Sequence, residues 1–138
     1  FQDPVLQMGF PGVEYFAHAH ELNPRIAKEF LLLGERMPAH RAYEMGMVNR
    51  VVPRDELEAE VAKITARLAE QPRLAMQLAK QAINHMETLA GKEAGIDASF
   101  GYHHFAHANN QLIKGDYIAG FDGKKMADKN KEQQAKKS

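Results

Sequence analysis

The stretch from residue 30 to residue 53 constrains the fold most, because two helix ends and an extended segment fall within it. An apolar run ends at Gly34, and a short helical stretch over residues 38–45 ends at Gly46. Glycine supplies the left-handed backbone conformation that often ends a helix. Residues 47–52 then read as an extended segment, closed by a proline that cannot continue a β-ladder. The neighbouring helices are therefore predicted to fold back on this stretch.

Apolar periodicity and capping residues predict helices on both sides of it. One helix covers residues 22–33, with Asn23 as its N-cap and Pro24 at the first helical position, where a missing N–H costs nothing. A second helix follows residue 53, and Asp55 with Glu58 resembles a capping box. Its apolar side chains recur at intervals of four, three and four residues and predict a single buried stripe, made of Leu57, Val61, Ile64 and Leu68.

Two further helices complete the predicted fold. The third begins at Pro72 and ends before Gly91, and the fourth covers residues 92–114. We predict four helices around one core, with short extended pieces near residues 1–8 and 47–52. The fold class is therefore mainly α with short extended segments.

Composition excludes several classes of function. The chain has 138 residues, which is enough for one domain that buries roughly two thirds of its unfolded surface. Lys plus Arg equals Asp plus Glu, at 18 each, so the chain has no net charge that would favour binding to nucleic acid or to a membrane. Cysteine is absent, which excludes disulfides and thiolate metal sites and fits a cytoplasmic location. No apolar run approaches the ~20 residues of a membrane span.

Three histidines raise the question of a metal site. His103 and His107 share a helix face because they lie four residues apart, and His104 is adjacent. A stable site needs three or four protein ligands, and the intervening sequence offers only two asparagines. We therefore predict a hydrogen-bonded or surface cluster and no metal.

The central stretch resembles the crotonase superfamily, the enoyl-CoA hydratases and isomerases, whose members carry a pattern like L-x-G-x-x-x-x-A-x-x-A-x-x-x-G-L-V-x-x-V-V-P. Residues 72–84 resemble a second pattern of that superfamily, P-x-x-A-x-x-x-x-K-x-x-[IV]-N. The residues that match the first pattern are Leu32, Gly34, Ala39, Ala42, Gly46, Met47, Val48, Val51, Val52 and Pro53. The resemblance implies the C-terminal half of the α/β crotonase fold.

Residues 1–12 resemble the superfamily's strand and loop beside the reaction centre. Val5 stands where typical hydratases carry a catalytic glutamate, and valine cannot move a proton. Asp3 would lie on the same side of an extended strand as position 5, because side chains alternate along a strand. Glu14 follows the turn and could point into the same pocket. Either carboxylate could act as the acid/base group, or both could be surface acids, and His18 or His20 could face the site.

The resemblance also implies a site for coenzyme A, which is part of the substrate and not a prosthetic group. In crotonases an aromatic residue and a lysine lie near the nucleotide, and here these would be Phe100 or Tyr102 and Lys124 or Lys125. Positive charges suit phosphates. A lysine-rich run such as the C-terminal end is usually solvated and often disordered; its lysines are Lys124, Lys125, Lys129, Lys131, Lys136 and Lys137.

The resemblance divides the chain into three parts: residues 1–21 as the end of the core β/turn region with the active-site loop, 22–114 as a helical oligomerisation region, and 115–138 as a basic tail. It implies a trimer or another homo-oligomer such as a dimer. It also implies that the backbone donors for the thioester oxygen precede Phe1, which is not a methionine. We expect an acyl-CoA enzyme that needs its N-terminal half or, alternatively, a non-catalytic helical module that self-associates.

Overall fold

The computed structural model describes residues 1–12, 15–118 and 122–135, and within these ranges the chain is mainly helical and forms no β-strand. The prediction of a mainly α fold is confirmed. The elements in chain order are two short 3₁₀ helices, η1 (Val5–Met8) and η2 (Arg54–Glu56), and the α-helices α1 (His18–Glu21), α2 (Pro24–Leu33), α3 (Ala39–Glu44), α4 (Leu57–Ala69), α5 (Arg73–Leu89), α6 (Lys92–Lys114) and α7 (Gly123–Ala135).

Local signals explain where the predicted helices begin and end. The Asn23 side chain accepts a hydrogen bond from the Arg25 N–H at 3.0 Å, which satisfies one of the free donors at the start of α2. Gly34 then ends α2 in the left-handed region, with φ at 60°. The predicted bounds of the fourth helix are those of α6.

Neither predicted extended piece is a strand. Val5 begins η1, and its N–H donates to the carboxylate of Asp3 at 3.3 Å, so a local side-chain contact supports a turn there. The N–H groups of Met47 and Val48 both donate to the carbonyl of Ala42, at 2.8 and 3.3 Å. The chain after α3 therefore turns back onto the end of that helix, and no neighbouring strand is present in the described residues to pair with it.

The predicted capping box before α4 does not form. Residues 54–56 form the 3₁₀ turn η2, Glu56 occupies the N-cap position of α4, and no side chain caps this helix end. The 3₁₀ turn moves the start of the α-helix two residues beyond Asp55. Asp55 therefore no longer occupies the position from which a capping side chain reaches the free N–H groups.

The core is small and lies among residues 1–12, which we call the N-terminal segment, and helices α2 and α3. Together these parts form the N-terminal unit. The backbone of Phe1 exchanges two hydrogen bonds of 2.8 Å with Met37, which closes this unit. Its buried apolar residues are Val5, Phe10, Ala17, Leu22, Ala27, Phe30, Leu31, Met37 and Ala42.

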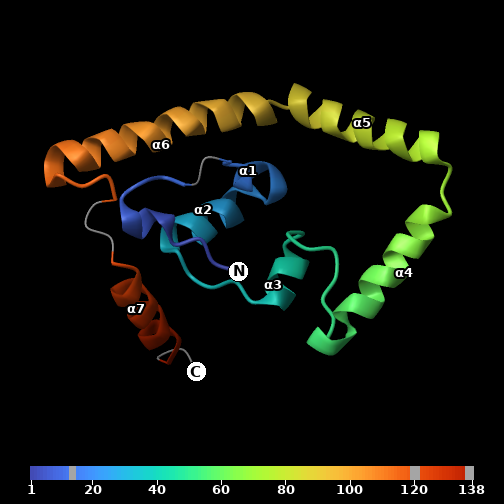
Figure 1. Cartoon of the computed structure of the whole chain (residues 1–138), viewed down its shortest axis with the longest axis horizontal. Helices are drawn as coiled ribbons and strands as arrows, with labels where there is room; N and C mark the ends of the chain where they lie inside the picture. Colours follow the sequence, from blue (N-terminus) through green and yellow to red (C-terminus); the bar gives the residue numbers. More distant parts are fainter. Residues whose placement is uncertain (13–14, 119–121, 136–138) are drawn as a thin grey trace.

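The prediction of four helices around one core was wrong. Helices α4 and α5 contain no buried residue, and Figure 1 shows them leading away from the N-terminal unit as an arm. Their apolar stripes stay exposed: Leu57 is 50% and Ile83 62% accessible. Helical spacing marks a face that can be buried, but it does not specify what buries it.

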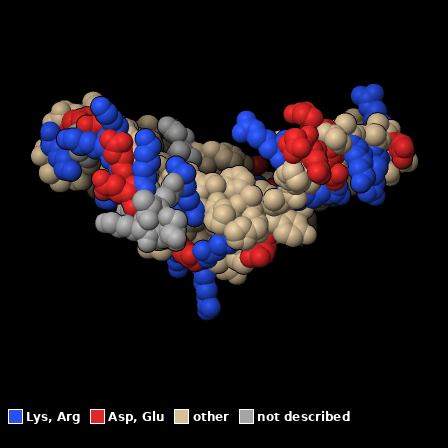
Figure 2. Space-filling view, turned by 90° about the horizontal axis from the view of Figure 1, so that it is seen from below, with Lys and Arg blue, Asp and Glu red and all other residues tan. Residues whose placement is uncertain are grey.

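Figure 1 shows α6 returning above α1 and α2, with α7 lower in the view, below the C-terminal end of α6. The lysine-rich end thus includes a helix, which the sequence reasoning did not anticipate. The side chain of Asp122 explains its start, because Oδ1 accepts the N–H groups of Lys124 and Lys125 at 3.0 and 3.1 Å. Charged side chains gather most densely at the two ends of the face in Figure 2. No helix in the described part is long and apolar enough to span a bilayer.

Candidate functional site

Asp3 and His18 form a pair at the N-terminal unit. Asp3 precedes η1 and His18 begins α1, and the distance from His18 Nε2 to Asp3 Oδ2 is 3.4 Å. Both side chains are largely covered, at 14% and 18% exposure. Of the two histidines that sequence reasoning placed near the site, His18 makes this contact and His20 is exposed.

The surroundings of His18 define how the pair can act. Its Nδ1 atom is buried without a hydrogen-bond partner in the described part of the chain, which favours the tautomer that carries its proton on Nε2, toward Asp3. The rings of Phe16 and Phe30 lie 5.2 and 6.1 Å from the imidazole, between centroids. The pair is therefore a carboxylate held by a histidine against an apolar wall, an arrangement that can perform acid/base chemistry.

Asp3 belongs to this pair, but the strand geometry from which it was predicted was wrong. It assumed a strand in which residues 3 and 5 point the same way, whereas Val5 is buried and begins η1. The Asp3 carboxylate is positioned instead by the turn, in which Oδ1 accepts the Val5 N–H. Glu14 lies outside the described residues.

A cavity of about 410 Å³ adjoins this region. It lies among the N-terminal segment, α1, α2 and α6, and its lining is almost entirely apolar. Phe16 lines the cavity and also packs against His18, so it separates the two features. Lys28 and Tyr102 are among its few polar residues. An apolar space of this size can hold a small apolar ligand group.

The N-terminal segment is attached to α6 by side chains that sequence reasoning did not connect. The buried amide of Asn110 lies 3.4 Å from the Met8 carbonyl oxygen and 3.3 Å from those of Gly9 and Tyr117. His103, also buried, bonds through Nδ1 to the Gly12 carbonyl at 2.6 Å. The two partners are 91 residues apart, so no local signal could have revealed this contact.

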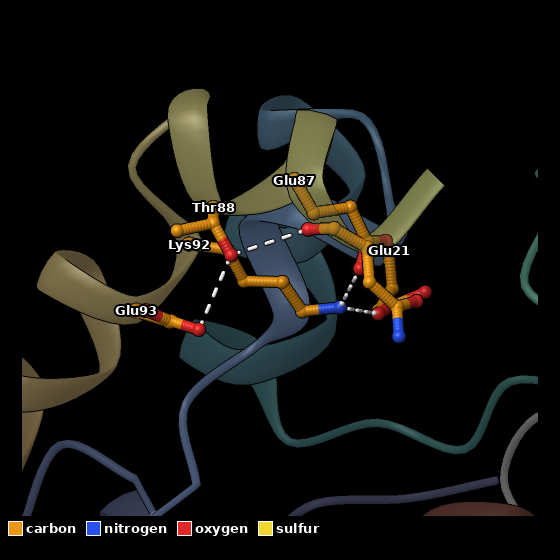
Figure 3. A network of polar contacts seen from close by, with 6 residues as sticks. Glu21, Glu87, Thr88, Lys92 and Glu93 are labelled. Carbon is orange, nitrogen blue, oxygen red and sulfur yellow. Dashed lines mark hydrogen bonds and ion pairs between the residues drawn. The ribbon is translucent and has the colours of Figure 1, made fainter. Parts of the chain in front are cut away.

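A second attachment surrounds Lys92, at the elbow between α5 and α6 (Figure 3). Its ammonium donates to Glu21 of α1 at 2.8 Å and to Glu87 of α5 at 3.1 Å. Thr88 donates to Glu93 at 3.2 Å across the same elbow. The hydrogen bonds to Glu21 and then to Glu87 raise the pKa of Lys92 well above its ordinary value.

Comparison with known proteins identifies the family. Residues 1–121 match the family described as enoyl-CoA hydratase/isomerase. The chain belongs to this family.

Individual family members resemble different shares of the chain. EchA13 of Mycobacterium tuberculosis, whose name assigns it only provisionally to the enoyl-CoA hydratases, is 38% identical over 120 residues, covering 86% of this chain and 38% of that protein. The crotonyl-CoA hydratase of Syntrophomonas wolfei is 35% identical over 95 residues, covering 67% of this chain and 36% of that protein.

A solved structure from Mycobacterium smegmatis, described as a probable enoyl-CoA hydratase, superposes with a TM-score of 0.83 at 41% identity. The superposition covers 88% of this chain and 49% of that one. The helical arrangement is therefore part of the crotonase fold. The chain spans less than half the length of each of these three family members.

The residues that the family resemblance suggested for coenzyme A lie on two helices. Tyr102 of α6 lines the cavity, and the ring of Phe100 contacts that of His104 edge-on, with centroids 4.4 Å apart. Lys124 and Lys125 are in the first turn of α7 and are exposed. Their role in nucleotide binding stays a prediction. In the described part of the chain, no three metal-ligating side chains converge.

Proposed function

We propose that the chain forms part of an enzyme that acts on an acyl-CoA thioester through an enolate, by hydration of a 2-enoyl-CoA or by a related isomerisation. Membership of the enoyl-CoA hydratase/isomerase family supports the substrate class. The observation that carries the proposal beyond the family is the Asp3–His18 pair, because it supplies a carboxylate near the position where typical hydratases have glutamate and this chain has Val5.

In the proposed reaction Asp3 acts as the acid/base group. Its carboxylate accepts a proton from the water that attacks C3 of the enoyl group. The Asp3 carboxylic acid then gives a proton to C2 of the resulting enolate, so that one water is added across the double bond and the carboxylate is regenerated. The His18 Nε2–H holds the carboxylate in position, and the apolar rings beside it limit access of further water. A positioned group of this kind contributes ~10²- to 10⁴-fold to a rate. Glu14 is the second candidate for the same role.

The developing charge on the thioester oxygen needs backbone N–H donors, and we propose that polypeptide other than these 138 residues supplies them. Removing one such donor typically costs ~3 kcal/mol of barrier stabilisation. Two observations support a further packing partner. The apolar stripes of α4 and α5 are exposed, and the chain spans less than half the length of the family members that it matches. The 138 residues alone would then be inactive.

The coenzyme A portion is proposed to lie along α6 and α7. Phe100 or Tyr102 would contact the nucleotide base, and Lys124 or Lys125 would pair with its phosphates. Tyr102, Lys124 and Lys125 are exposed, and Phe100 is about half exposed. We further propose a homo-oligomer, a trimer or a dimer, assembled through the helical region.

Crotonyl-CoA hydration tests this function. The rate is measured for the 138-residue chain and again with any residues encoded upstream of Phe1 restored, each beside Asp3→Asn and the matched control Asp55→Asn. We expect activity only when the upstream residues are restored. That activity should fall at least 100-fold in Asp3→Asn and stay unchanged in Asp55→Asn. Full activity in the short chain would refute the proposed external donors. An active Asp3→Asn variant would refute the role of Asp3.

A further inference from the structure

We propose that Lys92 is a positioning residue for the Asp3–His18 pair, because it fixes the orientation of α1, the short helix that begins with His18. The geometric part of this inference rests on contacts among α1, α5 and α6. Its catalytic consequence rests on the proposed role of Asp3 as the acid/base group.

Helix α1 is a single turn that cannot hold its own orientation. The N–H groups of His20 and Glu21 donate to the Ala17 carbonyl at 2.9 and 3.1 Å, and no side chain in the described residues caps the N-terminus of this helix. A first helical turn fixes several backbone dihedrals for very few hydrogen bonds, so a helix of this length is unstable by itself in water. The direction in which α1 points its side chains therefore depends on contacts with other elements.

Polar contacts hold both ends of α1. His18 is its first residue, and Nε2 of this ring lies 3.4 Å from Asp3 Oδ2. Glu21 is its last residue, and Oε1 of this carboxylate accepts a hydrogen bond from Lys92 Nζ at 2.8 Å. Residues three positions apart are neighbours on one face of a helical turn. A rotation of α1 that moved Glu21 away from Lys92 would therefore also move the His18 ring relative to Asp3.

The position of Lys92 is itself well fixed. It is the first residue of α6 and follows Gly91, whose φ of 88° forms the elbow after α5. Its side chain is only 13% exposed, and its ammonium also donates to Glu87 Oε2 at 3.1 Å. Figure 3 shows the ammonium between the carboxylates of Glu21 and Glu87. Hydrogen bonds between charged groups are stronger than those between neutral groups, so this contact can restrain a short helix.

Helix α6 connects the two partners of the pair. A Cβ atom at Gly95, three residues beyond Lys92, would lie 3.8 Å from His20 Nε2, so α1 rests against this part of α6. Further along α6, the Asn110 amide contacts the carbonyls of residues 8 and 9 in the N-terminal segment, which also carries Asp3. The same helix thus holds the segment of Asp3 through Asn110 and the turn of His18 through Lys92.

The two carboxylates around Lys92 make its charge important. Glu21 and Glu87 lie on different helices and contact the same ammonium, so they would repel each other if that charge were removed. Lys92→Met would therefore replace an attraction between α1 and the elbow by a repulsion. Glu21→Gln removes the attraction without leaving a repulsion, so it should disturb α1 less.

The exchange rate of the His18 Nε2 proton with water, measured by NMR in the 138-residue chain at neutral pH, tests the geometric inference. It should rise at least about tenfold in Lys92→Met and by a smaller factor in Glu21→Gln, because exchange proceeds through local opening and a charged hydrogen bond is lost. Lys92→Arg should stay near the wild-type rate, since a guanidinium can bind both carboxylates. The control Lys63→Met removes an exposed lysine that lies 3.9 Å from Glu60 within α4 and should not change the rate.

Hydrogen–deuterium exchange of the Phe30 backbone N–H, in the core, separates positioning from general destabilisation. Faster exchange at His18 with unchanged exchange at Phe30 supports the proposal. An unchanged His18 rate in Lys92→Met would overturn it, and so would an equal acceleration at His18 and Phe30. A faster His18 rate in Glu21→Gln than in Lys92→Met would also count against the proposed role of the charge.

Kinetics of the protein with any residues encoded upstream of Phe1 restored test the catalytic consequence. Lys92→Met should lower kcat for crotonyl-CoA hydration by ~10- to 10²-fold and leave KM nearly unchanged, because displacement of an acid/base group slows the chemical step. Lys92→Arg should recover most of kcat, and an unchanged kcat in Lys92→Met would overturn the catalytic part. If the wild-type protein shows no hydration, the proposed function fails, and the exchange measurements alone decide whether Lys92 positions the pair.

Discussion

Substitution of Gly12 by alanine should destabilise the chain through one steric contact. A Cβ atom at Gly12 would lie 2.6 Å from Cδ2 and 2.9 Å from Cε2 of Phe16, closer than real Cβ contacts allow. Phe16 packs against the core and lines the cavity, so its ring has to move within packed surroundings. Gly12 does not have a positive φ, so no backbone strain adds to the overlap.

The magnitude follows from two opposing terms. Overpacking of this kind costs ~1–3 kcal/mol. Replacing glycine by alanine at a tolerated backbone conformation returns ~0.4–1 kcal/mol, because it restricts the unfolded chain. A net loss of about 0.5–2.5 kcal/mol in the free energy of unfolding is therefore expected for Gly12→Ala.

Urea denaturation followed by circular dichroism measures this loss, and a double-mutant cycle with Phe16→Ala assigns its cause. Without the ring, Gly12→Ala should be neutral or slightly stabilising, which gives a coupling energy of about 1–3 kcal/mol. Gly101→Ala is the matched control, because its Cβ meets no atom within 4 Å inside α6 and should stabilise the helix by up to ~1 kcal/mol. Additive effects of Gly12→Ala and Phe16→Ala would refute the reasoning.

Three further predictions concern the attachment of α6 and the exposed arm. Asn110→Ala should cost ~1–3 kcal/mol of unfolding free energy, because partly buried carbonyls lose their donor; a loss below the error of denaturation would contradict this. Lys92→Met should speed amide hydrogen exchange at the α5–α6 elbow. The pKa of Lys92 is raised in the folded chain, so the stabilising contribution of its ion pairs is present at neutral pH and is lost only as pH rises beyond the ordinary lysine range. Unchanged amide exchange in Lys92→Met at pH 7 would contradict this prediction. Ile83→Glu and Met86→Glu, at residues 62% and 64% exposed, should change stability by less than ~0.5 kcal/mol while weakening self-association in sedimentation.

The features that the sequence predicted correctly rest on local interactions. The start of α2 depends on Asn23 and Pro24, and its end depends on Gly34, all within one helix. The bounds of α6 were equally readable from apolar spacing between two glycines. Matches spaced along residues 30–53 indicated the family, which the comparison over residues 1–121 establishes.

Local patterns failed where another part of the chain decides the outcome. The apolar stripes of α4 and α5 predicted a shared core, but burial of a stripe requires a facing surface that their sequence does not encode. Residues 47–52 have a strand-like composition, but a strand needs a partner for its N–H and C=O groups. Here the first two N–H groups of the segment bind the end of α3 instead.

The sequence by itself determined the ends of α2 and α6, the mainly α fold class and the family, because each depends on residues a few positions apart or on a spaced pattern. Only the tertiary structure decided the partners of the candidate site residues. Asp3 meets His18 through a turn, His103 reaches Gly12 across 91 residues, and Lys92 reaches Glu21 across 71. The last two contacts depend on how α6 crosses the N-terminal unit. In all three, the polar side chains follow no periodic pattern from which their partners could be predicted.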